Sequence, residues 1–312
     1  MLKRKWMTVL AVLALAMASL NWTTTAQAAT KKKIMTTFYP VYYLAQRIAG
    51  DKAEVSMLLE GNQDAHDYEI SAKDAAKIQQ TDLFIYQDDE MEHFVSDLKK
   101  LLDTDKTRVA KTTDGIELLK GDAEEAGEEH EEHEHHEGEH HHEFDPHTWM
   151  DPLTYAKQAE NVKKALTELD PDNKETYEAN AKALQEDLTK LDAEFKEKTA
   201  KLSDKTFVVQ HAAFGYLAHA YGLEQKAITG ISDTKEPSAS ELAEMQAFVK
   251  EHNTKVIYVD PALDDAIAKT VASATNAELR PLRTLESVSA DEIAKGADYF
   301  SIMRENLASL TK

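Results

Sequence analysis

Apolar and polar residues alternate in short blocks along the first half of the chain. The runs KIMTTF at 33–38 and DLFIY at 82–86 are short and rich in apolar residues, which is typical of buried strands. The segment 40–50, PVYYLAQRIAG, has apolar residues at helical spacing between an initial proline and a final glycine, as many helices do. Strict alternation of strand and helix predicts a parallel sheet covered by helices. Further strands are predicted at 53–59 and 107–111, and further helices at 71–80 and 91–102.

The same alternation returns in the last third of the chain, from KTFVVQH at 205–211 to a helical pattern at 298–312. We therefore predict a second α/β lobe with its own parallel sheet. Ligands of open parallel sheets bind beyond the carboxyl ends of the strands, so the loops that follow these strands are of most interest. The remaining predicted strands are 225–230, 256–261 and 279–282, and the remaining helices are 213–222, 238–253 and 264–276.

A helical stretch without strands, from about 152 to 200, separates the two alternations. One apolar stripe with spacings of four and three residues runs along it. We interpret this stretch as a long rigid helix laid along both lobes, which would restrict hinge closure; a coiled coil with another chain is the alternative. The predicted domains are an N-terminal lobe at 29–152, a connector at 153–203 and a C-terminal lobe at 204–312. The stripe consists of Tyr177, Ala181, Leu184, Leu188, Leu191 and Phe195.

Residues 1–28 have the three-part layout of a secretory signal peptide. A basic start, Lys3 to Lys5, precedes an apolar run over about 9–20 and the small-residue sequence Ala26-Gln27-Ala28, so we expect cleavage before Ala29. The run is shorter than the roughly 18–20 apolar residues that span a bilayer. We therefore expect export to the periplasm or to the outer side of the cytoplasmic membrane. The chain has no cysteine, so we expect no disulfide, no thiolate ligand and no lipid-anchor cysteine.

The formal net charge is −21, and removing residues 1–28 would make it three units more negative. Nucleic acid is therefore not an expected partner, because binding it requires a basic face. Much of the acid lies in residues 121–143, which contain eleven Asp and Glu and no Lys or Arg. This composition is typical of a solvated loop that cannot bury a core. The same loop contains seven of the thirteen histidines: His130, His133, His135, His136, His140, His141 and His142.

Three histidines outside this tract occupy predicted loops. His66 follows the second strand in GNQDAHDYEIS, His147 precedes a helix in FDPHTWMDP, and His211 ends the strand TFVVQH. All three lie on connections of the kind that line a cleft between two α/β lobes. Taken singly, each is better interpreted as a surface or hydrogen-bonded histidine than as a metal ligand.

These motifs, in this order, resemble those of the zinc-type metal-binding proteins that serve bacterial ABC importers. The resemblance covers nearly the whole chain beyond residue 28. It includes VVQHAAFGYLAHAYGL at 208–223 and EPSASEL at 236–242. It implies that His66, His147 and His211 bind one metal ion. It also aligns LRTLES at 282–287 with the segment of the fourth ligand, which is Glu286 here; Asp260, at the end of the strand VIYVD, is the competing candidate.

The ligand chemistry favours Zn²⁺, which prefers four ligands in a tetrahedron and accepts neutral imidazole well. Manganese prefers carboxylates and water. Relatives that resemble manganese importers generally have a carboxylate at the position of His211, so this residue bears on the choice of metal. Histidines titrate near pH 6.5, and we therefore expect the affinity for zinc to fall below roughly pH 6.

The resemblance makes the histidine tract an accessory that binds several metal ions weakly and raises their local concentration near His147. The tract also contains HEGEH at 136–140, which matches the two-histidine metalloprotease pattern. Gly138 lies in its centre and no apolar helix face accompanies it, so we interpret the match as chance. Four protein ligands also leave no open position on zinc, which argues against an enzyme.

The resemblance thus implies an exported, monomeric protein that captures Zn²⁺ between two lobes and delivers it to an ABC permease in the cytoplasmic membrane. Metal exchange with other zinc-binding proteins is a further expected contact. Three alternatives stay open: capture of manganese instead of zinc, a metal-dependent surface adhesin on the same fold, and a zinc hydrolase.

Overall fold

The computed structural model describes residues 30–61, 63–121, 143–231 and 237–312. The chain divides into two units, residues 1–31 and 32–312, and the fold discussed below belongs to the second. The predicted signal peptide therefore lies outside the described residues. Among the helices that the structure describes, none is both long and apolar enough to cross a bilayer.

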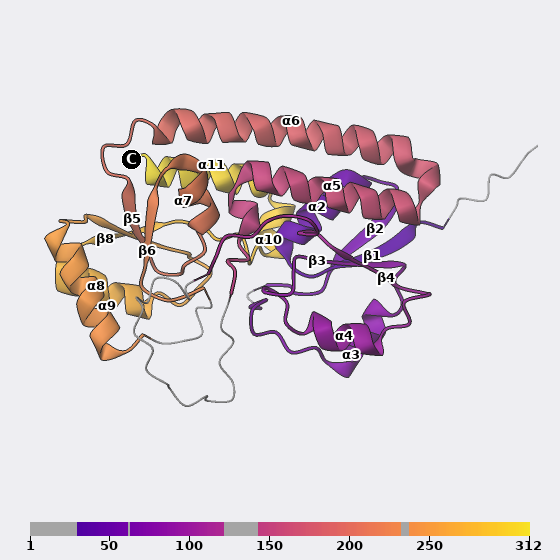
Figure 1. Ribbon diagram of the computed structural model, residues 1–312, viewed down its shortest axis with the longest axis horizontal. Helices are drawn as coiled ribbons and strands as arrows, with labels where there is room; N and C mark the ends of the chain where they lie inside the picture. Colours follow the sequence, from indigo (N-terminus) through magenta and orange to yellow (C-terminus); the bar gives the residue numbers. More distant parts are fainter. Residues whose placement is uncertain (1–29, 62, 122–142, 232–236) are drawn as a thin grey trace, which may run out of the picture. The chain divides into compact units, whose positions relative to one another are not determined.

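Two four-stranded parallel sheets form the two lobes (Figure 1). The first has the order β2-β1-β3-β4 and the second the order β6-β5-β7-β8, so the same topology occurs twice. All strand pairs are parallel, as the alternation of the sequence predicts. The strands are β1 Lys32–Thr36, β2 Ala53–Met57, β3 Leu83–Tyr86, β4 Arg108–Lys111, β5 Thr206–Val209, β6 Glu224–Ala227, β7 Val256–Val259 and β8 Glu278–Pro281.

Helices cover both faces of each sheet. Alternate residues of a strand enter different apolar clusters: Ile34 faces the central cluster, whereas Met35 faces a smaller one with α3 (Ala72–Ile78) and α4 (Val95–Leu101). In the second lobe, α8 (Ala239–Glu251) and α9 (Ala266–Thr275) cover the equivalent outer face. Burial on both faces explains why the central strands β3, β5 and β7 are almost continuously apolar, whereas the edge strands β4, β6 and β8 carry charged residues and are partly exposed.

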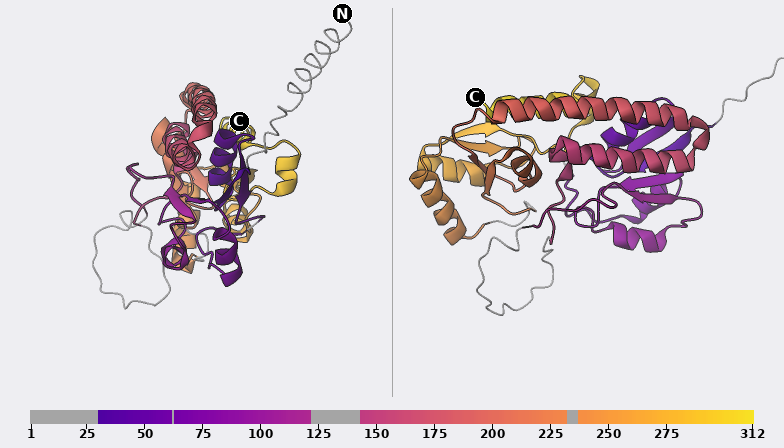
Figure 2. Two further views of the ribbon diagram at one scale, coloured as in Figure 1. Left: turned by 90° about the vertical axis from the view of Figure 1, so that its right-hand side faces the viewer. Right: turned by 45° about the horizontal axis from the view of Figure 1, so that its top comes forward.

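The long helical stretch is two helices instead of one. Helix α5 (Pro152–Leu169) and helix α6 (Lys174–Thr199) lie side by side and are joined by the short turn Pro171–Asn173 (Figures 1 and 2). Pro171 explains the break, because its ring cannot continue the preceding helix. The Asp170 carboxylate then accepts hydrogen bonds from Asn173 and from the Tyr177 hydroxyl, which fixes the turn.

The apolar stripe of α6 is fully buried within the chain, as predicted for a helix laid along the lobes. Helix α6 contacts α2 (Tyr39–Ala49) and α5 at one end, and α7 (Gly215–Tyr221) and α11 (Tyr299–Leu310) at the other. All of these helices share one apolar cluster. The predicted domain limits at 152 and 203 therefore remain a prediction, since one core runs through the connector and both lobes.

Local details differ modestly from the sequence interpretation. Helix α4 begins at Val95 because Met91 to Phe94 form turns, and α10 (Ala290–Ala294) was not predicted. The segment EPSASEL contains the start of α8, where the Ser238 side chain and Glu241 form a reciprocal capping box.

Candidate metal centre

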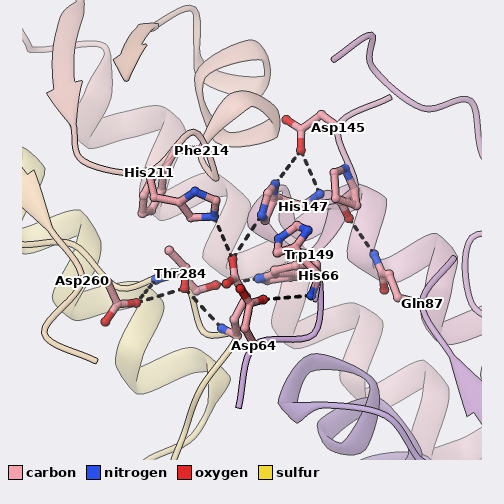
Figure 3. Close-up of polar contacts among 12 residues, drawn as sticks. Asp64, His66, Gln87, Asp145, His147, Trp149, His211, Phe214, Asp260 and Thr284 are labelled. Atoms are coloured by element: carbon pink, nitrogen blue, oxygen red, sulfur yellow. Dashed lines mark hydrogen bonds and ion pairs between the residues drawn. The ribbon is translucent and has the colours of Figure 1, made fainter. Parts of the chain in front are cut away.

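The four residues singled out in the sequence, His66, His147, His211 and Glu286, come together in one place. Each offers a nitrogen or oxygen atom, and these four atoms all lie within 4.8 Å of one another. His66 follows β2, His211 follows β5 and Glu286 follows β8, so strands of both sheets direct their carboxyl ends toward the same point. Figure 3 shows the three imidazole rings turned toward one another.

His66 lies in the loop between β2 and α3 and is 3% exposed. Its backbone N–H donates to Asp64 Oδ1 at 2.8 Å, a local bond typical of an aspartate two residues before a turn. The ring packs against the rings of His147 and His211, with centroid distances of 5.3 and 5.9 Å. The rings of His147 and His211 are themselves 5.1 Å apart, so the loop adds a third buried imidazole to a compact group of three.

His147 lies just before the short helix η2 (Thr148–Met150) and is fully buried. Its Nδ1 lies 2.8 Å from Asp145 Oδ1, and its backbone N–H donates to the same oxygen at 2.9 Å. The carboxylate therefore fixes both the ring and the backbone of His147. This arrangement directs Nε2 toward the cluster and raises the basicity of the imidazole as a ligand.

His211 lies two residues after the end of β5, and its Nδ1 lies 3.0 Å from the carbonyl oxygen of Gly230. A carbonyl can only accept, so this contact places a proton on Nδ1 and directs Nε2 toward the cluster. Nε2 of His211 lies 3.4 Å from Glu286 Oε1. The ring is thus oriented with Nε2, the nitrogen that would bind a metal, toward Glu286.

Glu286 lies in the loop after β8, and its side chain is only 9% exposed. Asp260, the competing candidate, follows β7 and is not among the clustered residues. Its Oδ2 accepts from the N–H and the hydroxyl of Thr284, at 2.6 and 3.0 Å, and its Oδ1 accepts from the N–H of Ala262. Figure 3 shows Asp260 paired with Thr284, away from the three imidazoles.

The distances suit a small tetrahedral ion. Zn–N and Zn–O bonds of about 2.0–2.1 Å require ligand atoms about 3.4 Å apart in a tetrahedron. Glu286 Oε1 lies 3.1 Å from Nε2 of His147 and 3.4 Å from Nε2 of His211. Two edges are therefore close to the required length, and the other pairs, within 4.8 Å, need only a small contraction.

The charges of the cluster are strongly coupled. Burial alone would lower the pKa of His147, but the carboxylates of Asp145 and Glu286 outweigh it and raise this pKa to about 10. Burial likewise opposes ionisation of Glu286, yet His211 and His147 together hold its pKa well below the usual value. Without a metal, a protonated imidazole therefore supplies the positive charge that pairs with the Glu286 carboxylate.

A buried network of amides and hydroxyls supports His147 from the first lobe. Gln87 Nε2 donates to the Pro146 carbonyl at 2.9 Å and to Thr148 Oγ1 at 2.5 Å, on either side of the histidine. Gln158, on α5, donates to Gln87 Oε1 and to Thr112 Oγ1. All five residues of the network are buried, so these hydrogen bonds hold the His147 segment in a fixed position.

Sequence reasoning missed the residues that support the ligands. Asp64 and Asp145 had a readable signal, since each precedes a predicted ligand by two positions and can accept its backbone N–H. No signal in the sequence pointed to Thr284, Trp149 or the Gly230 carbonyl, because their contacts join positions far apart in the sequence. The histidine tract, with HEGEH, lies outside the described residues apart from its ends.

The ends of the tract are described and are paired. Gly121 N–H donates to the Glu143 carbonyl and Asp145 N–H donates to the Leu119 carbonyl, each at 2.9 Å, around an antiparallel bridge between Lys120 and Phe144. We call residues 119–121 and 143–145 the stem. The stem enters the site directly, because Asp145 is its last residue.

Comparisons with known proteins agree with this geometry. The protein family described as "Zinc-uptake complex component A periplasmic" matches residues 34–312. The high-affinity zinc uptake system protein ZnuA of Bacillus subtilis is 39% identical over 280 residues, which cover 90% of this chain and 86% of the relative. The zinc-binding lipoprotein AdcA of Streptococcus pneumoniae is 40% identical, over 91% of this chain and 56% of AdcA. The chain therefore spans about half of the AdcA relatives.

Solved structures give the same picture. The Zn(II)-bound ZnuA-like domain of Streptococcus pneumoniae AdcA has a TM-score of 0.75 and 38% identity, over 90% of this chain and 98% of that domain. The laminin-binding protein Lmb of Streptococcus agalactiae has a TM-score of 0.77 and 33% identity, over 90% of this chain and 98% of Lmb. Its structure is described as that of a bifunctional protein with adhesin and metal-transporting activity.

Proposed function

Because the chain belongs to the family of periplasmic zinc-uptake component A proteins, we propose that it captures one Zn²⁺ ion with His66, His147, His211 and Glu286. The loaded protein then delivers the ion to an ABC permease in the cytoplasmic membrane. The observation that carries the ligand assignment is the convergence of these four donor atoms within 4.8 Å.

The charge of the surroundings supports a divalent cation. Neutral imidazoles contribute three of the four donors, and Glu286 contributes one negative charge. Asp145 contributes a second negative charge through its 2.8 Å contact with His147 Nδ1. Two carboxylates therefore match the charge of Zn²⁺ in a buried site, where an unbalanced charge would be costly.

The number of ligands supports binding and transport over catalysis. Four protein donors complete the tetrahedron, whereas catalytic zinc sites keep a position for water or substrate. The family is one of transport proteins, which is consistent with this interpretation. No step of bond making or breaking is required of the site, only capture, retention and release of the ion.

A competitive zinc titration tests the ligand set. The chain is titrated against a chelator of known affinity, beside His211→Ala and the control His219→Ala, which removes an exposed histidine of α7. We expect one tight site in the parent and the control, and strong loss of affinity in His211→Ala. Equal tight binding by all three would contradict the assignment. The same titration with Mn²⁺ tests metal choice, for which three imidazoles predict weak binding.

We also propose that residues 122–142, which connect the two halves of the stem and contain the histidine tract, bind additional zinc ions weakly and serve as an accessory store. The stem supports this role, because it fixes both ends of the tract beside His147. A sharp test replaces residues 122–142 by Asn-Gly, which closes the existing Gly121–Glu143 pair as a two-residue hairpin. The number of zinc ions bound should fall while the tight site keeps its affinity. Loss of the tight site would place the primary function in the tract.

A second candidate function is adhesion at the cell surface, and the likeness to Lmb favours it. Adhesion would use the exterior of the same fold, with the metal as a structural element. The test measures binding to immobilised laminin with and without zinc, beside a zinc-uptake assay in cells. Laminin binding by His211→Ala at the parental level, together with lost uptake, would separate the two activities.

The location and the partners of the protein follow from its proposed role in zinc transport. The family description places the protein outside the cytoplasm, in agreement with the basic and apolar start of the sequence. We propose that it acts as a monomer, exchanges zinc with other zinc-binding proteins there and docks on its permease. Size-exclusion chromatography with light scattering of the zinc-loaded chain tests the monomeric state, which a stable dimer would contradict.

A further inference from the structure

The residue two positions before Glu286, Thr284, is held by three side-chain contacts. Asp260 Oδ2 accepts from its N–H at 2.6 Å and from its hydroxyl at 3.0 Å. Its carbonyl accepts from Trp149 Nε1 at 2.7 Å. All of these groups are buried: Asp260 is 4% exposed, Thr284 2% and Trp149 0%. We call Asp260, Trp149 and Thr284 the threonine clamp.

The backbone on both sides of Thr284 is constrained as well. The Asn306 side chain accepts from Arg283 N–H and donates to Arg283 O, both at 2.8 Å. Leu285 has φ +64° although it is not glycine, and it is completely buried. A leucine in this left-handed conformation costs of the order of 1–2 kcal/mol and persists only where the surroundings enforce it. The turn that presents Glu286 is therefore held in a strained form.

The clamp connects two ligands that come from different parts of the fold. Trp149 follows His147 by two residues, and its indole contacts the His147 ring with a centroid distance of 5.2 Å. Its own carbonyl accepts from Tyr299 Oη, on α11, at 2.7 Å. The Trp149–Thr284 bond thus ties the His147 segment to the Glu286 turn, across 135 positions of sequence.

We propose that Asp260 and Trp149 are positioning residues that hold the Glu286 carboxylate at the metal position before zinc arrives. This inference rests on the proposed function, because it assigns Glu286 as a ligand. The strained turn would relax without the clamp, and Glu286 would then lose conformational freedom on each binding event. Preorganised ligands bind more tightly because this ordering cost is already met in folding.

The clamp also explains why a carboxylate at the end of β7 is present without being a ligand. Both Asp260 oxygens already accept hydrogen bonds from neighbouring groups. Burial raises the pKa of Asp260, but these donors favour its ionised form and counteract that rise. Asp260 therefore acts on the metal through Thr284 and the turn, not through direct contact.

The test uses Trp149→Phe, which keeps an aromatic ring and removes the indole N–H, and Asp260→Asn, which keeps the size and removes the charge. The control Tyr155→Phe removes another buried side-chain bond to a carbonyl, from Tyr155 Oη to Pro40 O at 2.6 Å. Loss of a supporting residue around a metal ligand typically weakens metal binding about 10–100-fold. We expect that loss in both clamp variants and unchanged zinc affinity in the control.

A double-mutant cycle with Glu286→Gln distinguishes positioning from general damage. If the clamp acts through the Glu286 carboxylate, Trp149→Phe should weaken zinc binding much less in the Glu286→Gln background than in the parent. An equal loss in both backgrounds would mean that the variant disturbs His147 or the fold, and would overturn the inference. Parental affinity of both clamp variants would overturn it as well.

The same cycle separates this inference from the proposed function. If Glu286→Gln alone binds zinc as tightly as the parent, the ligand assignment fails and the clamp loses its purpose. If Glu286→Gln weakens binding but the clamp variants do not, the ligand assignment stands and the positioning role fails. Thermal unfolding of each metal-free variant shows whether the chain is still folded in the assay.

Discussion

Gly215 should be required for zinc affinity although it touches no metal. A Cβ atom at this position would lie 2.3 Å from Asp145 Oδ2. The backbone does not require glycine here, since φ of Gly215 is outside the left-handed region. Gly215 is the first residue of α7, where alanine would ordinarily be tolerated or favoured. The close approach of Asp145 is therefore the reason for a glycine in AFGY.

The size of the effect follows from the contact. A carbon and an oxygen atom normally approach no closer than about 3.4 Å, so Gly215→Ala must displace the Asp145 carboxylate by about 1 Å. Its other oxygen binds His147 Nδ1 at 2.8 Å and His147 N–H at 2.9 Å. A displacement of this size would break at least one of these bonds. A hydrogen bond to a charged group is worth about 1.5–3 kcal/mol, which corresponds to about 10–100-fold in zinc affinity.

The assay is the chelator competition described above, with thermal unfolding of the metal-free protein beside it. We expect Gly215→Ala to bind zinc about 10–100-fold more weakly while the helix itself is not destabilised. In Asp145→Ala, the carboxylate is absent, so adding Gly215→Ala should cause little further loss. Parental affinity of Gly215→Ala, or a full second loss in the double variant, would refute this reasoning.

Three further outcomes can be checked independently. The pKa of His147 is raised to about 10, so zinc must displace a proton from this imidazole throughout the neutral range. The affinity for zinc should therefore rise about tenfold per pH unit from pH 6 to 8, instead of falling only below pH 6. An affinity that does not change with pH over this range would contradict the prediction. Asp88 is buried, and burial is the main cause that raises its pKa to about 7. None of the described residues donates a hydrogen bond to its Oδ2. Because the unfolded chain ionises this carboxyl near pH 4, the folded state loses stability as the pH rises from about 4 through 7. The midpoint of thermal unfolding of Asp88→Asn minus that of the parent should therefore increase between pH 5 and 8, and a constant difference would argue against the raised pKa. Leu188→Ala, in the fully buried stripe of α6, should cost about 2–5 kcal/mol of unfolding free energy in urea without changing zinc affinity, and a large affinity loss would instead indicate that α6 positions the site.

Much of the fold was predictable from the sequence because buried parallel strands are short apolar runs. All eight strands fall within or overlap the predicted runs, and their parallel pairing follows from the intervening helices. The order of strands followed only in part. The edge strands β4, β6 and β8 (RVAK, EQKA and ELRP) carry charged residues, unlike the apolar central strands β3 and β7 (LFIY and VIYV), but this contrast does not say which central strand each edge strand pairs with. The break at Pro171 had a signal, but the continuous stripe from Tyr177 onward obscured it.

The four clustered residues were predictable from motif resemblance, and their local supports were partly predictable. The pattern Asp-x-His occurs at both Asp64-Ala65-His66 and Asp145-Pro146-His147, and in both cases the aspartate accepts the histidine N–H. The bond from Trp149 to Thr284 was not predictable, because a tryptophan in an apolar motif is equally typical of a core residue. Contacts of this kind depend on how the lobes pack, and a single sequence carries no direct record of that.

Asp145 limits how the histidine tract can be separated from the tight site. Its N–H belongs to the stem, its Oδ1 holds His147, and its Oδ2 lies against Gly215 on the segment that follows His211. The stem is itself anchored, because Leu119 N–H donates to Tyr216 Oη at 2.8 Å and the Glu90 carboxylate accepts from the backbone N–H groups of Glu143 and Phe144.

A deletion that stops within 122–142 should therefore leave the affinity of the tight site intact, whereas one that extends through the stem to Asp145 should weaken it even though no ligand is removed. The two deletions are compared by the same chelator competition, with Asp145→Ala as the matched point variant. If the longer deletion binds zinc like the shorter one, the stem does not position His147, and Asp145 must be held by Gly215 and the α7 region alone.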